Sequence, residues 1–296
     1  MVVDLHTSGS ADLLALLGPY VALAGVLGYL YLAVTGSRPW PIRRSVLWLV
    51  GSAAITLSVS GPLAAAADED FTAHMSTHLL LGMLGPLLLV LAAPVTLLLR
   101  WLPARTARRL GRLLSCRPLR ILTEPVVAAA ISSGGLWVLY TTALYPAMHH
   151  RPVVHLLVHA HLFIGGYLFA VAMISVDPLP HRRSHLHRNV VLILSLAAHG
   201  VLAKYLYGHP PVGVAASAAE TGSLLMYYGG DAVEVVVLII LWQRWYHSRR
   251  PRSARSAPTG PYPTTAGERA RIRRDDPHPV GPGSGSVAGR HQRADH

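Results

Sequence analysis

The chain has 296 residues, of which 52% are hydrophobic and 14% charged, and its formal net charge is +12. A soluble domain carries about a quarter charged residues, so this composition argues against a soluble enzyme or a soluble nucleic-acid binder. The positive charge lies mostly in arginines between long apolar blocks and near the C-terminus, which favours a membrane surface over nucleic acid as its partner.

Seven apolar segments follow one another along the chain, and each has roughly the twenty residues that a membrane-spanning helix needs. They cover about 13–34, 46–67, 74–99, 126–145, 153–176, 190–207 and 223–246. Pro86 and Pro94 lie inside the third segment, where neighbouring helices can satisfy the backbone groups that a proline leaves free. The sequence therefore predicts an all-α polytopic membrane bundle of about seven helices within residues 1–246.

The connecting loops alternate between few and many basic residues. The N-terminal stretch, the loop around Asp68 and the 208–222 loop contain no Lys or Arg, and the 146–152 loop contains one Arg. The loops between them are basic, with seven Arg from Arg100 to Arg120. Because basic loops stay in the cytoplasm, we expect the N-terminus outside and the C-terminus inside.

The character of the chain changes after the last apolar segment. Residues 247–296 are rich in Arg, Pro, Gly and Ser and contain little that a core could bury, which predicts a disordered cytoplasmic tail. Its arginines would either contact the anionic inner leaflet or only fix the topology.

Sequence motifs of catalysis are absent. The chain contains no GxxxxGK[ST] phosphate loop, no HExxH and no GxSxG elbow. Cys116 is its only cysteine, so neither an intramolecular disulfide nor a CxxC copper or redox pair can form. We therefore expect a protein that is not an enzyme.

Ionisable side chains inside membrane spans are costly and often mark function, and here they gather toward the predicted outer side. His74 and His78 lie four residues apart near the outer end of the third segment and thus share one face. His155 and His159 repeat this spacing in the fifth segment. Further polar or sulfur-bearing side chains toward the same side are those of Met75, Met148, His149, His150, His199, Lys204, Asp231 and Glu234.

Two interpretations of this polar layer compete. An i, i+4 histidine pair is a common metal clamp, and imidazole together with thioether suits copper, so the two pairs would form one four-histidine site or two separate sites. In the other interpretation the layer is a hydrogen-bonded network that holds the helices in register, with Lys204, Asp231 and Glu234 in structural ion pairs. Residue spacing alone does not choose between them.

Three stretches of the chain carry a family resemblance. They are FTAHMSTHLLLGMLGPLLLVLAAPVTLLLR, with an HMxxH pair and a later AP; YPAMHHRPVVHLLVHAHLFIGGYLFAVAMISVDPLP, with a DPLP exit; and LLMYYGGDAVEVVVLIILWQRWY. In this order they resemble the CtaG family of cytochrome c oxidase assembly factors, over roughly residues 13–246. The resemblance implies a helical bundle of the bacterial plasma membrane that helps mature a haem–copper oxidase, with oxidase subunits as partners.

The resemblance also implies that copper is supplied to the buried catalytic site of the oxidase. It carries the metal role to His74, His78, His155 and His159, and in second rank to Asp231 and Glu234. Soluble copper chaperones use a cysteine pair, which this chain lacks. The sulfur ligands near the histidines that suit Cu(I) are then Met75, Met148 and Met226.

Three other functions fit the same residues. A membrane redox protein would hold haem between histidines of different helices. An ion or proton transporter would use Lys204, Asp231 and Glu234, although no convincing inverted repeat is present. A scaffold for oxidase subunits would use the histidines only for packing.

Overall fold

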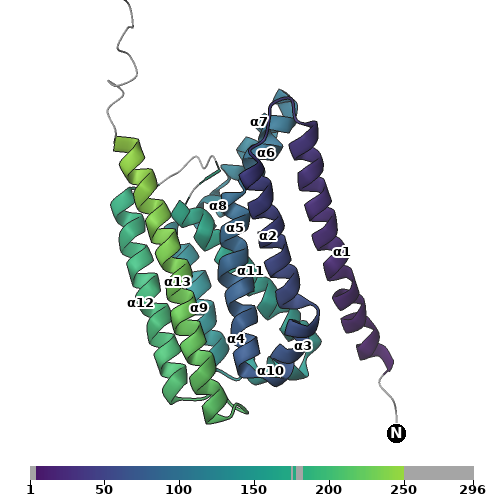
Figure 1. Cartoon of the computed structure of the whole chain (residues 1–296), viewed down its shortest axis with the longest axis vertical. Coiled ribbons are helices and arrows are strands. Elements are labelled where there is room, and N and C mark those ends of the chain that lie inside the picture. The colour runs from purple at the N-terminus through teal and green to yellow at the C-terminus, as the bar shows by residue number, and fades with distance from the viewer. Residues whose placement is uncertain (1–4, 175, 178–182, 250–296) are drawn as a thin grey trace, which may run out of the picture. The chain divides into compact units, whose positions relative to one another are not determined.

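The computed structural model describes residues 5–174, 176–177 and 183–249, which form helices joined by short connections, with no strand among them (Figure 1). The helices are α1 (Leu5–Thr35), α2 (Ile42–Val59), α3 (Pro62–Glu69), α4 (Phe71–Leu79), the π-helical turn η1 (Leu80–Leu84), α5 (Gly85–Leu91), α6 (Pro94–Trp101), α7 (Ala104–Leu114), α8 (Arg117–Leu122), α9 (Pro125–Thr141), α10 (Leu144–His150), α11 (Pro152–Ile174), α12 (His185–Gly208) and α13 (Ala216–Arg249). The predicted tail, 247–296, lies outside the described residues from residue 250 onward.

The predicted all-α membrane bundle is confirmed, since every one of the seven apolar segments is helical. Five helical stretches are long and apolar enough to cross a membrane, and the bent pair of α9 and α10 would make a sixth. The first segment lies in α1, a helix of 31 residues that includes the apolar stretch Pro19–Thr35. A seventh span and the direction of the termini therefore stay predictions.

Three of the expected spans are interrupted where the backbone leaves the helical conformation. The second segment stops at α2 and restarts as α3, because Gly61 has a positive φ of 82° and Pro62 begins the new helix. The fourth ends at Thr142, and the expected loop 146–152 is largely the short helix α10, bent by 77° from α9.

The third segment breaks between α5 and α6, where Ala93 has a φ of 54° just before Pro94. Polar side chains from other parts of the chain satisfy groups freed at this break, as the bilayer demands. The hydroxyl of Tyr29 donates to the carbonyl of Ala92 at 2.9 Å. Asp177 accepts hydrogen bonds from the backbone N–H and the hydroxyl of Thr96, at 2.7 and 2.6 Å. The AP motif, Ala93-Pro94, and Asp177 thus lie at one structural joint.

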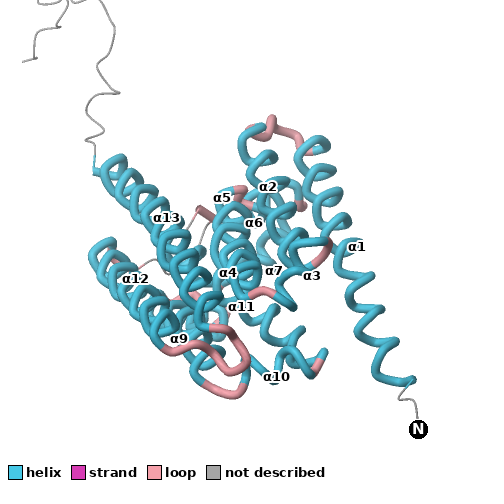
Figure 2. Tube along the Cα trace, turned by 60° about the horizontal axis from the view of Figure 1, so that its bottom comes forward, coloured by secondary structure: helices cyan, strands magenta, loops and turns pink. Residues whose placement is uncertain are grey.

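The helices pack so that α4, α9, α11, α12 and α13 surround a common interior, while α1 packs on α2 and α6 (Figures 1 and 2). One buried apolar cluster, with Phe71, Tyr140 and Met226 among its members, lies toward the end where α4 begins. A second cluster, with Phe169 and Leu241, lies toward the opposite end. We call the first end the histidine-rich end; it is the lower end in Figure 1 and the one predicted to face outward.

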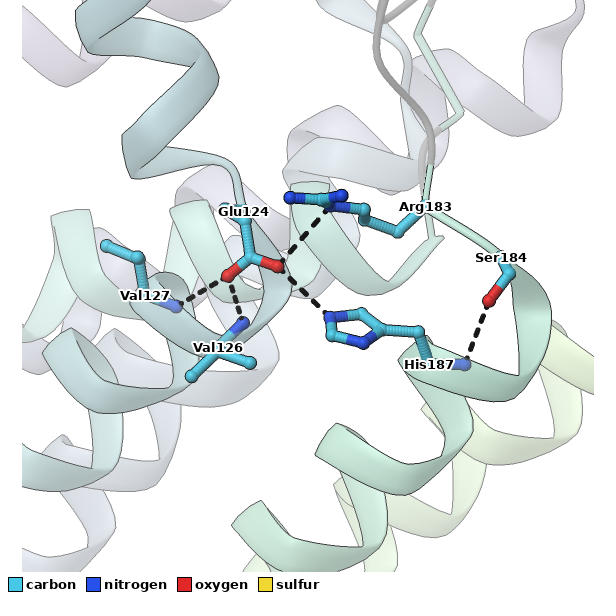
Figure 3. Close-up of polar contacts among 6 residues, drawn as sticks. All are labelled: Glu124, Val126, Val127, Arg183, Ser184 and His187. Atoms are coloured by element: carbon cyan, nitrogen blue, oxygen red, sulfur yellow. Dashed lines mark hydrogen bonds and ion pairs between the residues drawn. The ribbon is translucent and has the colours of Figure 1, made fainter.

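At the opposite end Glu124 joins α9 to α12 (Figure 3). One of its carboxylate oxygens accepts from the N–H groups of Val126 and Val127 and caps α9. The other oxygen lies 3.0 Å from Nε2 of His187 and 3.6 Å from Nε of Arg183. This clamp fixes the start of α12, the helix that carries His199.

Two helices approach most closely where η1 meets α11. A Cβ added at Gly166 would overlap the backbone carbonyl oxygen of Gly82, so these backbones touch directly. Small residues permit such contact between helices in a membrane. Because η1 follows His78 and α11 begins three residues before His155, the contact sets the distance between both histidine pairs.

We predict that Gly166→Ala lowers the free energy of unfolding by about 3 kcal/mol, because a backbone oxygen cannot move aside as a side chain can. Reversible unfolding in mixed micelles measures the change. Gly134→Ala is the matched control, since a Cβ at Gly134 meets nothing within 4 Å. Equal stability of the two variants would contradict the close contact.

Candidate functional site

The site begins at the start of α4, which places its first histidine at the histidine-rich end of the bundle. Asp70 caps α4 by accepting from the N–H of Ala73 at 2.7 Å. One turn later His74 and Met75 point into the interior, with exposed fractions of 4% and 0%. An imidazole and a thioether therefore lie side by side beneath the rim.

Aromatic side chains of α9 and α10 surround His74. Its Nε2 lies 3.1 Å from the hydroxyl of Tyr140, which is also 3.8 Å from the sulfur of Met75. The single hydroxyl proton can serve either of these acceptors. The rings of Tyr145 and His149 lie 5.3 and 6.4 Å from the His74 ring, between centroids.

His155 and His159 stack on each other in α11, with ring centroids 4.1 Å apart. Nδ1 of His159 lies 2.9 Å from the carbonyl oxygen of His155, so this nitrogen is the donor and Nε2 keeps its lone pair. The rings of both residues lie within electrostatic range of His74, as does that of His149. We name His74, Met75, His149, His155 and His159 the outer cluster.

His78 faces a different neighbour although it shares a helix with His74. Its ring lies 6.2 Å from that of His199 in α12, between centroids. The two rings line a cavity of ≈ 40 Å³ together with Glu234 of α13. The cavity lies between the two apolar clusters and one helical turn deeper than His74. The predicted four-histidine set is thus divided between two places.

The remaining predicted residues occupy varied positions. Met148 is buried in the apolar cluster near His74, and His150 is exposed. None of the ion pairs between described residues joins Lys204 to Asp231 or Glu234, so the expected ion pairing is absent. The exposed Lys204 places its ammonium 5.2 Å from the ring centre of Tyr227 instead. A long side chain can keep its charge near the membrane boundary in this way, which a buried partner would prevent.

Within the described part of the chain, no three His, Cys, Asp or Glu side chains already converge as ligands of one metal ion. An ion at the outer cluster would therefore bind through a smaller set that includes Met75, or after side-chain rotation. Sequence reasoning missed Tyr140 and Tyr145, because tyrosines at the end of an apolar segment are typical of any membrane interface. Their depth beside His74 depends on the bend between α9 and α10.

Comparison with known proteins places the chain in a family. The model of the cytochrome c oxidase caa3 assembly factors, Caa3_CtaG, matches residues 26–248. The chain belongs to this family. Its apolar helices and this membership identify a multi-pass protein of the plasma membrane, as the sequence predicted. No solved structure matches the chain significantly.

Curated relatives come from mycobacteria. Uncharacterised proteins of Mycobacterium bovis and Mycobacterium tuberculosis are each 31% identical over 195 residues, which is 64% of this chain and 29% of theirs. One from Mycobacterium leprae is 31% identical over 190 residues, 60% of this chain and 29% of its own. The chain thus matches less than a third of the length of these relatives.

We predict that Tyr140→Phe lowers the free energy of unfolding by about 1 kcal/mol, because buried Nε2 of His74 loses its partner. Tyr145→Phe is the matched control: its ring lies in the same aromatic cluster, and none of the hydrogen bonds between described residues uses its hydroxyl. Its effect should stay below about 0.5 kcal/mol. Unfolding in mixed micelles compares the two, and a larger loss for Tyr145→Phe would contradict the hydrogen bond.

Proposed function

We propose that this chain binds copper as cargo at the outer cluster and passes it to a subunit of a cytochrome c oxidase during assembly, without catalysing a reaction. The observation that supports this most is the gathering of His74, Met75, His149, His155 and His159 at one end of the bundle. That end is predicted to face outward, where the ion would be received.

The ligand chemistry of the cluster suits copper that must leave again. Imidazole and thioether bind Cu(I), and without a cysteine pair the ion is held by neutral ligands alone. Tyr140 can accept a hydrogen from Nε2 of His74, which would orient Nδ1 toward an ion as outer hydrogen-bond partners do in metal sites. Because few neutral ligands would bind the copper ion, its coordination could change easily and the ion could be released.

Exposure is graded from the rim to the interior of the cluster. His149 is exposed, His155 and His159 are half-buried, and His74 is buried. Asp68 on α3 is exposed and lies within electrostatic range of His155 and His159. A carboxylate at the rim attracts cations, so an ion arriving from outside would first meet negative charge and then imidazoles.

We predict that replacing His74, His155 and His159 together with Ala abolishes copper retention at the outer cluster. The protein is purified in detergent, loaded with Cu(I) under reducing conditions, desalted and analysed by mass spectrometry, with folding checked by thermal melting. The matched control replaces the exposed histidines His150, His209 and His247 with Ala and should bind as wild type does. A folded triple variant with undiminished copper would contradict the proposed cluster.

A second experiment separates copper handling from a scaffold role. In a bacterial strain without its own factor, wild type should restore both the activity and the copper content of the oxidase. The outer-cluster variant should restore neither, and added copper should rescue it in part. Full restoration by a variant that binds no copper would favour the scaffold.

A further inference from the structure

The cavity between the two apolar clusters concentrates polar atoms that have no partner in the protein. His78, His199 and Glu234 are only 2%, 3% and 3% exposed. Both ring nitrogens of each histidine and one oxygen of Glu234 make no hydrogen bond to any described residue. The three residues line one cavity, His78 from α4, His199 from α12 and Glu234 from α13.

Such an arrangement is costly unless something binds there. Each buried polar group without a partner destabilises the fold, and more so where the surroundings are a bilayer. Native proteins leave few such groups, and a cluster of them in one place marks a ligand, an ion or bound water. The hydrogen bond between Ser133 and Ser195, at 3.0 Å, shows that other polar groups of this cavity do find partners.

The packing around the cavity leaves room for the rings. A Cβ at Gly230 would overlap the His199 ring, and one at Gly82 would lie 3.4 Å from that of His78. Gly230 therefore favours glycine for the space that the His199 ring needs, whereas a Cβ at Gly82 would make an ordinary contact with the His78 ring. Helix α13 is thus shaped around His199.

The distance between the rings fits a shared metal ion better than a direct hydrogen bond. Two imidazoles bound in line on opposite sides of one two-coordinate ion, with metal–nitrogen bonds of about 2 Å, have ring centres roughly 6 Å apart. A direct hydrogen bond between ring nitrogens would bring the centres to roughly 5 Å. The observed 6.2 Å, with planes tilted by 31°, agrees with the first arrangement.

We propose that His78 and His199 form a second, buried site that holds Cu(I) between two imidazole nitrogens, with Glu234 balancing its charge. A monovalent ion accepts so few ligands more readily than a divalent one, and a single carboxylate nearby makes the site neutral overall. His74 stands one turn before His78 on the same face, roughly 6 Å along the helix. The ion would therefore pass from the outer cluster to the deeper site. The identity of the ion, though not the existence of the site, rests on the proposed function.

Titration of the full chain in detergent with Cu(I), against a coloured competing chelator, counts the sites. Wild type should bind two equivalents, the outer-cluster triple variant one, and His199→Leu one. X-ray absorption of the copper in the triple variant should show two nitrogen neighbours. The matched control is His161→Leu, which removes a histidine that lines the same cavity but whose Nε2 contacts the carbonyl of Ile131 at 3.1 Å; it should bind two equivalents.

His199→Met replaces the imidazole with a thioether, which also binds Cu(I). This variant tests the deep site even if His199→Leu does not fold. It should bind two equivalents, and a sulfur neighbour should appear in the absorption spectrum when the outer cluster is removed as well. A spectrum without sulfur would overturn the deep site.

The outcomes separate this inference from the proposed function. If wild type binds one equivalent that is lost with the outer cluster but kept in folded His199→Leu, the deep site is wrong and its cavity holds water. If the one equivalent is lost in His199→Leu and kept without the outer cluster, the outer-cluster function is wrong and the deep site stands. Wild type that binds no Cu(I) overturns both.

Discussion

The arrangement of this protein depends on the direct backbone contact between Gly166 of α11 and Gly82 of η1. The helices that meet there carry both i, i+4 histidine pairs. In a bilayer no hydrophobic effect drives helices together, so close packing of small residues carries much of the association. The π-helical turn lies at this contact and begins two residues after His78. Extra backbone width at a functional position is a frequent use of such turns.

The same constraint explains the joint between α5 and α6. A break inside a membrane span frees backbone groups that water cannot reach, and each must find a partner within the protein. Tyr29 and Asp177 supply these partners from helix α1 and from the segment after α11. The break therefore ties three parts of the chain together at the end opposite the histidine-rich end.

The sequence was sufficient to predict much of the fold. Apolar character located the seven membrane segments, but the short helices α7, α8 and α10 fall largely in stretches predicted as loops. Gly61 and Pro62 lie at the break of the second segment and Pro94 at that of the third, yet the sequence predicts both segments as continuous spans, because membrane helices tolerate such residues. The third break, at Thr142, has no such residue. Helix α10, which the sequence predicts as a loop, matters for the site because it brings Tyr145 and His149 close to His74.

The sequence identifies the histidines of the candidate site, but it does not show which of them lie next to one another in the fold. Spacing shows that His74 and His78 share a face, yet four residues turn a helix by slightly more than one full turn. Depth then decides the neighbours: His74 meets α9 and α10, whereas His78 reaches His199. Lys204 was assigned an ion pair from its residue type alone, and only the packing of α12 shows that it lies over Tyr227.

The motifs that carry the family resemblance divide by physical role. The AP dipeptide and Asp177 lie at one hydrogen-bonded joint, so they stabilise the backbone at the break. The HMxxH motif instead spaces three donors along one helix, an imidazole and a thioether near the rim and an imidazole one turn deeper. In the proposed function, donors spaced in this way would hold a soft cation by neutral groups at successive depths. Each step then requires only the exchange of one weak ligand for another, which is what a protein that must give up its cargo needs.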